Sequence, residues 1–354
     1  MINKPVRVGL VGYGFSGKTF HAPLITSVRG LELTTIASSD PAKVHADLPS
    51  VAVVPNPQAI VSSGEIDLVV VATPNDTHAP IARAAIEAGK HVVVDKPFTL
   101  DMGEARELIA LAERKGVLLS VFHNRRWDSD FLTIRRAIAD GLVGNVTHFE
   151  SHIDRFRPQV RDRWRERGGP GSGLWFDLGP HLVDQALQLF GLPDSVQTNL
   201  AQQRTGALAP DWAHSVLNYG ERRIILHATM LSAGGSARFI VHGDAGSVVK
   251  QNADIQEEQL RAGMRPGEPG WGEDPDELIV YDGEGASRKI PALQGDQRAY
   301  YHAIVDALGG KPENLVTPVQ ALAVMAVIEA GIDSAGKGTS LRVPLTLKER
   351  ANGI

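Results

Sequence analysis

The chain has 354 residues, of which 43% are hydrophobic and 22% charged, and it contains no cysteine. This length suits two domains, and the composition is that of an ordinary globular protein. The formal net charge of -5 gives no general attraction to nucleic acid or anionic lipid, and the lack of cysteine excludes disulfides, thiol catalysis and thiolate metal sites.

The first third of the chain alternates short apolar strands with helical patterns. Strands are predicted at 6–11, 33–37, 66–72, 91–94 and 117–122, and helices at 15–28, 77–88 and 101–116. Parallel strands joined by helices form a doubly wound sheet that binds its ligand at the carboxyl ends of the strands. Residues 1–122 are therefore predicted to form a Rossmann domain.

The pattern changes after His123. A helix at 130–140 precedes strands at 146–153, 196–201, 213–218, 223–230 and 237–242, a series typical of an antiparallel sheet. The segment 263–275 is rich in Gly, Pro and Glu and is predicted to be a surface loop, and helices follow at 297–308 and 318–335. Residues 123–354 are thus predicted to form an α+β domain, which makes the whole chain α/β.

A glycine motif, Gly12-Tyr-Gly14-Phe-Ser-Gly17, follows the first strand directly and opens a helix. Gly12 permits the tight turn, Gly14 admits a pyrophosphate to the backbone, and Gly17 lets helix and strand pack closely. The alternative is a purely structural glycine turn. The strand-turn-helix context favours dinucleotide binding through Gly12, Gly14, Phe15, Ser16 and Gly17.

The end of the second strand separates NAD from NADP, because an acid there binds the ribose 2′-hydroxyl and repels a 2′-phosphate. Ser38 occupies this position, followed by Ser39 and Asp40. We therefore favour NADP over NAD, with Ser38 and Ser39 as contacts. Asp40 would serve NAD if the register shifts, no arginine stands in the loop, and both serines could be plain turn residues.

Three polar segments follow predicted strands and are expected to border the nicotinamide: 73–78, 95–97 and 122–127. Lys96 follows a buried strand and precedes a proline, which restricts its backbone, although a structural ion pair with Asp95 is the alternative. The predicted cofactor contacts in these segments are Thr73, Pro74, Asn75, His78, Lys96, Pro97, Asn124 and Arg125.

The segment 174–184 is predicted to be a loop entering a helix, with Pro180 at the first helical position. Hydride transfer to a carbonyl needs a group that exchanges the hydroxyl proton near neutral pH, usually histidine with a lysine or aspartate partner. Lys96, Asp177 and His181 are the candidates. The alternative for Asp177 and His181 is a helix cap and a histidine with ordinary structural contacts.

The basic run 155–167 interleaves arginine with aromatic residues, as some nucleic-acid-binding segments do. Acidic residues interrupt it, so internal ion pairs in a solvated loop are favoured, with substrate or cofactor contacts as a further option. The glycines of 168–173 would suit a small lid or a linker.

These motifs in order resemble the glucose-fructose oxidoreductase, inositol dehydrogenase and MocA (Gfo/Idh/MocA) family. They are 12–23, 73–78, 95–97, 123–127 and the Asp177-x-Gly-x-His181 pattern. The stretches 123–131 and 154–158 are similar in particular to YdgJ-like oxidoreductases and NADP-dependent scyllo-inositol dehydrogenases. One departure is Asp95, where the family's lysine motif usually begins with glutamate. Another is Ser39 or Asp40, where the scyllo-inositol relatives carry an arginine.

The resemblance implies a Rossmann domain and a second domain whose large open sheet forms a homodimer or homotetramer. It implies that Lys96 contacts cofactor and substrate, that His181 is the acid/base group and that Asp177 orients the substrate or His181. The expected substrate is a small polyol, cyclitol or keto-sugar. The expected substrate contacts are Lys96, Arg125, Trp127, His152, Arg155, Asp177 and His181, with no metal ligand.

Two other functions stay open: a cofactor-binding regulator without catalysis, and a reductase of an unrelated small carbonyl. The N-terminus lacks the features of a signal peptide, and there is no uncharged apolar stretch of ~20 residues, the length that crosses a bilayer. We therefore expect a cytoplasmic protein without membrane or nucleic-acid partners.

Overall fold

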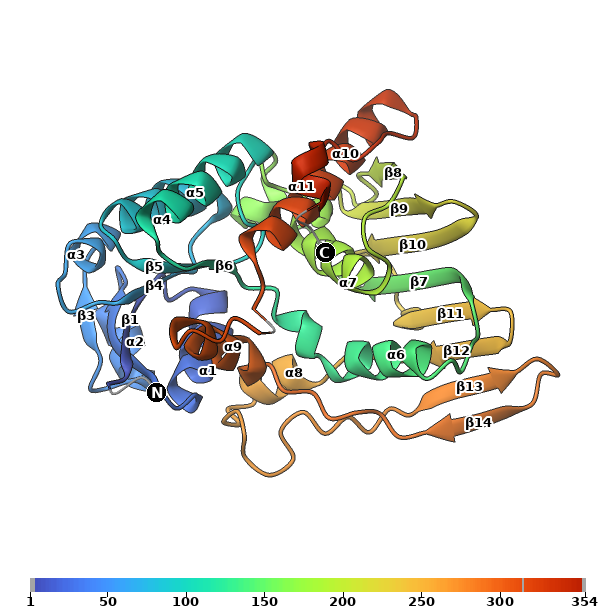
Figure 1. Cartoon of the computed structure of the whole chain (residues 1–354), viewed down its shortest axis with the longest axis horizontal. Helices are drawn as coiled ribbons and strands as arrows, with labels where there is room; N and C mark the ends of the chain where they lie inside the picture. The colour runs from blue at the N-terminus through green and yellow to red at the C-terminus, as the bar shows by residue number, and fades with distance from the viewer. Residues whose placement is uncertain (1–3, 314, 352–354) are drawn as a thin grey trace. The chain divides into compact units, whose positions relative to one another are not determined.

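The computed structural model describes residues 4–313 and 315–351 and divides into two compact units (Figure 1). Unit 1 contains the residues up to Asn124 together with Gln256–Trp271 and Asp296–Leu322. Unit 2 contains Arg125–Ile255, Gly272–Gly295 and the residues from Ala323. The expected boundary at 122 lies close to the first division, but the sequence did not assign the two later segments to unit 1.

Unit 1 is built on a six-stranded parallel sheet with the strand order β3-β2-β1-β4-β5-β6. The chain runs outward from β1 through β2 to β3 and then crosses to β4 on the other side of β1. This reversal between β1 and β4 is where a doubly wound sheet binds its ligand. The strands are β1 (Val6–Val11), β2 (Leu31–Ala37), β3 (Ala52–Val54), β4 (Leu68–Val71), β5 (His91–Val94) and β6 (Leu119–Val121).

Helices cover both faces of this sheet, so its central strands are mostly apolar: β4 reads LVVV, and Arg7 is the one charged residue of β1. In Figure 1, α4 and α5 pack together over one face and α1 packs against α9 on the other. The helical elements are η1 (Gly17–His21), α1 (Ala22–Ser27), α2 (Pro41–Asp47), α3 (Pro57–Val61), η2 (Asn75–Thr77), α4 (His78–Glu87), α5 (Met102–Lys115), α8 (Gln256–Arg261) and α9 (Arg298–Leu308). The element η3 (Asn124–Trp127) spans the division between the units.

Helix α5 begins and ends where the sequence predicts. The Asp101 side chain accepts a hydrogen bond from the Glu104 backbone N–H at its start, and Gly116 ends it in the left-handed conformation with φ of 65°. The short elements α2, β3 and α3 were not predicted, because three to seven residues are too few to show a period.

Unit 2 is built on an eight-stranded sheet with the order β14-β13-β12-β11-β7-β10-β9-β8. Only β7 and β10 pair in parallel, so the predicted mainly antiparallel sheet is confirmed. The last three strands were not predicted. The strands are β7 (Val146–Asp154), β8 (Ser195–Ala201), β9 (Trp212–Tyr219), β10 (Arg222–Thr229), β11 (Phe239–Gly243), β12 (Gly246–Lys250), β13 (Leu278–Asp282) and β14 (Ser287–Ile290).

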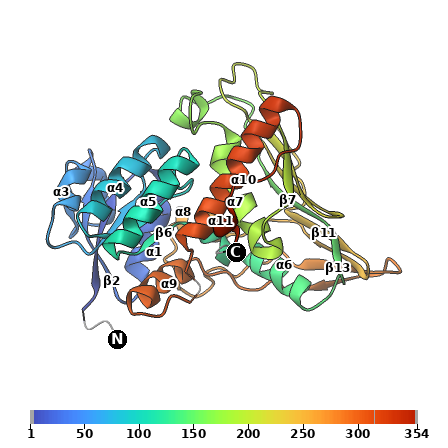
Figure 2. The same cartoon turned by 45° about the horizontal axis from the view of Figure 1, so that its top comes forward.

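The helices associated with this sheet are α6 (Ser129–Ala139), η4 (Trp164–Glu166), α7 (Leu174–Phe190), α10 (Pro318–Lys337) and α11 (Leu347–Ala351). In Figures 1 and 2, α6, α7 and the unit 2 part of α10 lie on one face of the sheet, and no described helix covers the other. Helix α10 has the length and mean hydropathy, 1.3, of a membrane span, but 61% of that window is buried inside the protein. Its apolar composition is therefore that of a core helix.

Candidate active site

The glycine turn lies between β1 and η1, at the predicted carboxyl edge of the parallel sheet. Gly12 has a φ of 99°, and a side chain there would overlap the carbonyl oxygen of Ala72. A side chain at Gly17 would overlap the carbonyl oxygen of Gly12. The protein's own packing therefore requires glycine at both positions.

Gly14 is different, because neither backbone conformation nor packing requires it. Its φ is not positive, and no described heavy atom lies within 4 Å of where its Cβ would be. The open space beside Gly14 is where the pyrophosphate of a dinucleotide approaches the backbone in this fold. Phe15, beside it, is 58% exposed. The chain's own packing does not explain why residue 14 is glycine, whereas a bound dinucleotide would. The turn therefore fits a dinucleotide.

Helix α2, which follows the loop after β2, contains a cation that sequence reasoning missed, Lys43. Asp40 caps α2 by accepting from the backbone N–H of Lys43, and the hydroxyl of Ser38 accepts from the backbone N–H of Asp40. The Lys43 ammonium lies 2.9 Å from the carbonyl oxygen of Tyr13 in the glycine turn. The second strand is thus followed, five residues after Ser38, by an ammonium group that reaches the glycine turn, and Asp40 Oδ1 accepts the cap hydrogen bond.

Lys96 follows β5 directly, and its peptide bond with Pro97 is cis. Its backbone N–H donates to Asp95 Oδ1 at 2.8 Å. Burial would raise the pKa of the Asp95 carboxyl, but contact with His21, attraction to His21 and Lys96 and a hydrogen bond from Ser16 outweigh burial and hold that pKa well below its usual range. Asp95 is therefore an anion that joins the glycine turn to Lys96.

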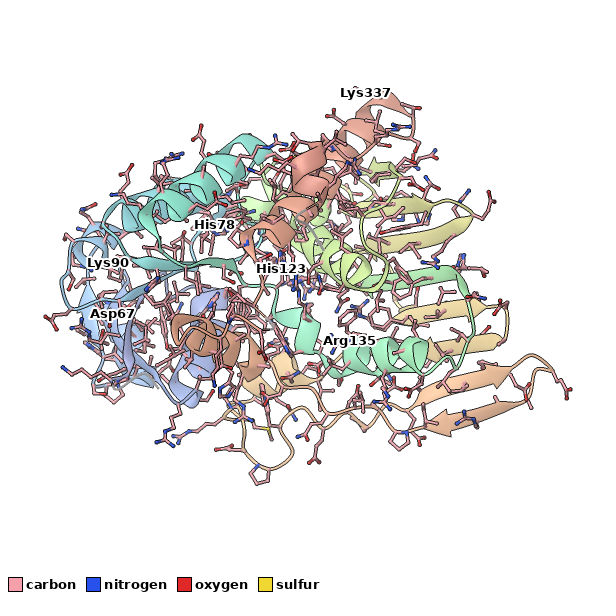
Figure 3. The ribbon with its side chains drawn as sticks, viewed as in Figure 1. Asp67, His78, Lys90, His123, Arg135 and Lys337 are labelled. Atoms are coloured by element: carbon pink, nitrogen blue, oxygen red, sulfur yellow. The ribbon has the colours of Figure 1, made fainter. Side chains whose placement is uncertain are left out.

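His78, labelled in Figure 3, is fully buried and connects the loops after β4 and β5. Its Nδ1 lies 2.8 Å from the Pro97 carbonyl oxygen and its Nε2 lies 3.0 Å from that of Thr73. Carbonyl oxygens only accept, so either neutral tautomer of the ring donates to one of the two. His78 thus supports the loops that carry Thr73 and Lys96, with both ring nitrogens turned to backbone rather than to a cofactor. Asn75, in η2 after β4, is also buried.

Asp177 and His181 are four residues apart within helix α7, so they lie about one turn apart on the same side of it. The prediction that Pro180 begins this helix is wrong, because α7 begins at Leu174 and contains Pro180 in its interior. A side chain at Gly179 would overlap Ile328 of α10 and the ring of Trp175. The glycine of the Asp-x-Gly-x-His pattern therefore lets α7 and α10 pack closely.

The basic run forms internal ion pairs, as the favoured interpretation expected. Arg163 and Arg204 each lie 3.0 Å from Glu166, and Arg165 lies 3.3 Å from Asp177. These residues line a small cavity of about 30 Å³ in unit 2. Arg165 is thus a contact of the candidate Asp177 that the sequence analysis did not single out.

The remaining predicted residues lie in η3 and after β7. Arg125 pairs with Asp128 at 2.9 Å, and its carbonyl oxygen accepts from the Gln185 side chain of α7. Its neighbour Arg126 makes a buried two-pronged pair with Asp184 of α7, at 2.7 and 2.9 Å. The backbone of Arg155 continues the pairing of β7 with β10. Arg125 and the helix that carries His181 are therefore joined within unit 2. The other two predicted residues of η3 are Asn124, at the end of unit 1, and the half-buried Trp127.

His152 lies on the face of the sheet away from α7. On β7, Phe149 packs against Phe190 of α7, and the side chains of His152 and Glu150 alternate to the other face. There His152 Nε2 lies 2.8 Å from Glu150, and its ring lies 5.4 Å from that of His227. The structure thus separates His152 from Asp177 and His181, and we do not retain it as a substrate contact.

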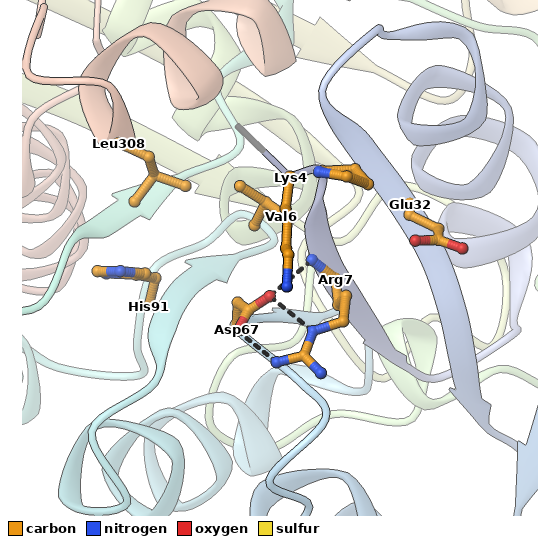
Figure 4. Close-up of a pocket in the computed structure, with 8 residues that line it drawn as sticks. Lys4, Val6, Arg7, Glu32, Asp67, His91 and Leu308 are labelled. Atoms are coloured by element: carbon orange, nitrogen blue, oxygen red, sulfur yellow. Dashed lines mark hydrogen bonds and ion pairs between the residues drawn. The ribbon is translucent and has the colours of Figure 1, made fainter. Parts of the chain in front are cut away.

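A larger cavity, of about 630 Å³, lies at the amino ends of β1, β2, β4 and β5 (Figure 4). Arg7 there makes a two-pronged pair with Asp67 and a further pair with Glu65. This is the opposite edge of the sheet from the glycine turn, and the Arg7 guanidinium there is paired with carboxylates. Among the described residues, no group of three or more His, Asp or Glu is arranged to hold a metal ion.

Comparison with known proteins agrees with this arrangement. Residues 6–123 match the family model described as the NAD-binding Rossmann fold of the Gfo/Idh/MocA oxidoreductases, and residues 135–345 match the model of their C-terminal alpha/beta domain. A crystal structure of an oxidoreductase from Klebsiella pneumoniae superimposes with a TM-score of 0.94 at 59% identity, covering 99% of this chain and 98% of that one.

Two curated relatives extend the match. The uncharacterised oxidoreductase YdgJ of Escherichia coli is 57% identical over 333 residues, which cover 93% of this chain and 96% of that protein. The scyllo-inositol 2-dehydrogenase (NADP(+)) IolW of Bacillus subtilis is 37% identical over 334 residues, covering 93% of each. The predicted resemblance and fold class are confirmed: the chain belongs to the Gfo/Idh/MocA family of NAD(P)-binding oxidoreductases.

Proposed function

We propose that the protein transfers a hydride between NADP(H) and a small polyol, cyclitol or keto-sugar, with NAD(H) as the less favoured cofactor. The observation that supports this proposal most is that the glycine turn is connected to Lys96. Gly14 leaves open space for a pyrophosphate, and Ser16 of the same turn contacts the Asp95 anion, which accepts a hydrogen bond from the Lys96 backbone. The similarity to a relative named as an NADP-dependent scyllo-inositol dehydrogenase supports the substrate class.

In this proposal the nicotinamide, when bound, supplies or accepts the hydride. His181 exchanges the proton of the substrate hydroxyl, and Asp177 orients the substrate or His181. Lys96 donates a hydrogen bond to the same substrate oxygen and contacts the cofactor. Arg125, Trp127 and Arg155 contact the substrate. The cofactor contacts are Gly12, Gly14, Phe15, Ser16, Gly17, Ser38, Ser39, Thr73, Pro74, Asn75, Lys96, Pro97, Asn124 and Arg125, with His78 as their support.

The experiment is a panel of inososes, keto-sugars, inositols and aldoses, each tested with NADPH or NADP⁺ and with NADH or NAD⁺, following absorbance at the nicotinamide wavelength. Oxidation of NADPH by an inosose or keto-sugar would support the proposal. Cofactor binding without turnover on any member would favour the regulator. Turnover of small aldehydes or ketones alone would favour reduction of an unrelated carbonyl.

Lys43 provides a test of cofactor preference. A hydrogen bond between charged groups contributes about 1.5–3 kcal/mol, so Lys43→Met should raise the Kd of NADPH ~10-fold or more. The Kd of NADH, which lacks the 2′-phosphate, should change less than about twofold on the same grounds. Titration of cofactor fluorescence measures both. Lys115→Met is the control, because Lys115 also donates to a backbone carbonyl, that of Glu87. Equal weakening of both cofactors by Lys43→Met would contradict the assignment.

We also propose that copies of the chain assemble through the uncovered face of the eight-stranded sheet. Cross-strand pairing aligns a row of partly exposed β-branched residues on that face, interrupted by Glu150. The row consists of Val216, Ile225, Ile240, Val249 and Ile279. A mainly apolar row on a sheet face that no described helix covers suits a self-complementary interface between two copies.

The expected consequence is that Ile225→Glu converts a dimer or tetramer into a monomer, because it adds a charge to the centre of this row. Light scattering coupled to size-exclusion chromatography measures the mass. Arg288→Glu is the control, since Arg288 is exposed and pairs with Val280 on the alternate face of β13 and β14. An unchanged mass for Ile225→Glu, or a monomeric wild type, would refute this interface.

A further inference from the structure

Unit 1 contains a chain of buried polar contacts that the roles above do not use. The hydroxyl of Tyr301, on α9, lies 2.6 Å from Nδ1 of His21, on η1. His21 Nε2 lies 3.7 Å from Asp95 Oδ2, slightly beyond hydrogen-bond distance, and has no nearer partner among the described residues. Tyr301 and His21 are 0% exposed and Asp95 is 7% exposed. The chain therefore runs through the core to the residue beside Lys96.

The chemistry of the two ends fixes the direction of the hydrogen bonds. Asp95 is an anion, so its Oδ2 only accepts, which favours a proton on His21 Nε2. His21 Nδ1 then accepts from the hydroxyl of Tyr301. Burial, with Tyr300 and Asp95 nearby, raises the pKa of Tyr301 well above its usual value, so the hydroxyl keeps its proton. Tyr301 thereby selects the ring tautomer that faces Asp95 with an N–H.

Asp95 is the point where this chain meets the candidate site. Its other oxygen accepts from the Lys96 backbone N–H at 2.8 Å, and Ser16 of the glycine turn contributes a side-chain hydrogen bond. The carboxylate also attracts Lys96 electrostatically. The orientation of the Asp95 carboxylate therefore influences the position of the Lys96 backbone and the stability of the Lys96 ammonium form.

Packing alone does not account for these polar groups. The His21 ring lies 4.2 Å from that of Phe122, and Phe122 lies 5.9 Å from Tyr301, so the polar groups lie among buried aromatic rings. Burying polar and charged groups costs free energy that an apolar set of similar volume avoids. We propose that Tyr301 and His21 are positioning residues that act through Asp95 on Lys96. This inference rests on the proposed role of Lys96 in the reaction.

Tyr300 supplies a matched control. It is the preceding residue on α9, is 1% exposed, and its hydroxyl lies 2.9 Å from the hydroxyl of Ser120. Tyr300→Phe and Tyr301→Phe each remove one buried hydroxyl from a hydrogen bond, and only Tyr301 faces His21. Similar losses of thermal stability are expected for the two variants. A difference between them in the reactivity of Lys96 would therefore come from the Tyr301–His21–Asp95 contacts and not from a general loss of stability.

The first test needs no substrate. Reductive methylation with formaldehyde modifies unprotonated amines, and mass spectrometry of the Lys96 peptide follows its rate against pH, with Lys337 as internal reference. A nearby opposite charge shifts a pKa by about 1–3 units in favour of the charged form. Asp95→Asn removes such a charge, so it should shift the methylation profile of Lys96 about one pH unit or more toward lower pH. Tyr301→Phe should shift it in the same direction by less, and Tyr300→Phe should leave it unchanged.

The second test uses scyllo-inosose and NADPH as probes. Tyr301→Phe should lower kcat by about 10-fold, the lower end of the effect of groups that orient a functional side chain from behind, with the Kd of NADPH within about twofold. Coupled residues give non-additive effects, so adding Tyr301→Phe to Asp95→Asn should lower kcat no further.

Identical Lys96 methylation profiles for wild type, Tyr301→Phe and Tyr300→Phe would overturn the inference, as would additive kcat losses in the double variant. Lys96→Met separates this failure from that of the proposed function. If Lys96→Met turns over scyllo-inosose normally, the proposed role of Lys96 fails whatever the methylation profiles show. If Lys96→Met is inactive and the methylation profiles coincide, the positioning chain alone fails.

Discussion

Replacing His181 with alanine is expected to lower kcat by ~10²–10⁴-fold, the usual contribution of a general acid or base. The Kd of NADPH should stay within about twofold, because the predicted phosphate-binding turn lies in unit 1 and His181 in unit 2. The loss should appear in the hydride-transfer step, since the substrate oxygen would lack its proton donor or acceptor.

Single-turnover measurements with scyllo-inosose and bound NADPH test this prediction, and fluorescence titration gives the Kd. Gln188→Ala is the control, because Gln188 lies on the same helix near its carboxyl end and has no assigned role. Undiminished turnover by His181→Ala would remove His181 from the mechanism. Equal losses in both variants would indicate damage to α7 instead.

Replacing Gly14 with alanine is expected to weaken NADPH binding by about tenfold or more without lowering the melting temperature. No described atom lies within 4 Å of the added methyl group, and the φ of Gly14 suits any residue. The methyl would instead occupy the space through which the pyrophosphate reaches the backbone, where displaced hydrogen bonds cost about 1–3 kcal/mol each.

Gly17→Ala gives the opposite pattern and serves as the comparison. Its methyl group would overlap the carbonyl oxygen of Gly12, so the melting temperature should fall, with a cost of about 1–3 kcal/mol typical of overpacking. Thermal unfolding and fluorescence titration distinguish the two variants. A Gly14→Ala protein that binds NADPH as tightly as wild type would show that this turn does not receive the pyrophosphate.

Several candidate site residues could be proposed from the sequence because their signals are local. The glycine turn needs only the strand before it and the helix after it, and Lys96 needs only a buried strand and a following proline. Lys43 was missed because α2 is too short to show a period. Arg165 was not singled out within the basic run, because its contact with Asp177 depends on how the segment between the two residues folds.

By itself, the sequence determined the alternation of strands and helices in unit 1, the mainly antiparallel character of unit 2 and the ends of helices such as α5. Hydrophobic period, caps and turn residues act over a few positions, so each can be read within a short window. The family resemblance likewise depends on ordered short motifs.

Only the tertiary structure decided which distant segments share a core. Tyr301 meets His21 across 280 positions, which places α9 in unit 1, and the alternation of β7 turns His152 away from α7. Pro180 lies inside α7, whose burial against the sheet and α10 stabilises a helix that local propensity would interrupt. Such outcomes depend on long-range packing, which no short window of sequence contains.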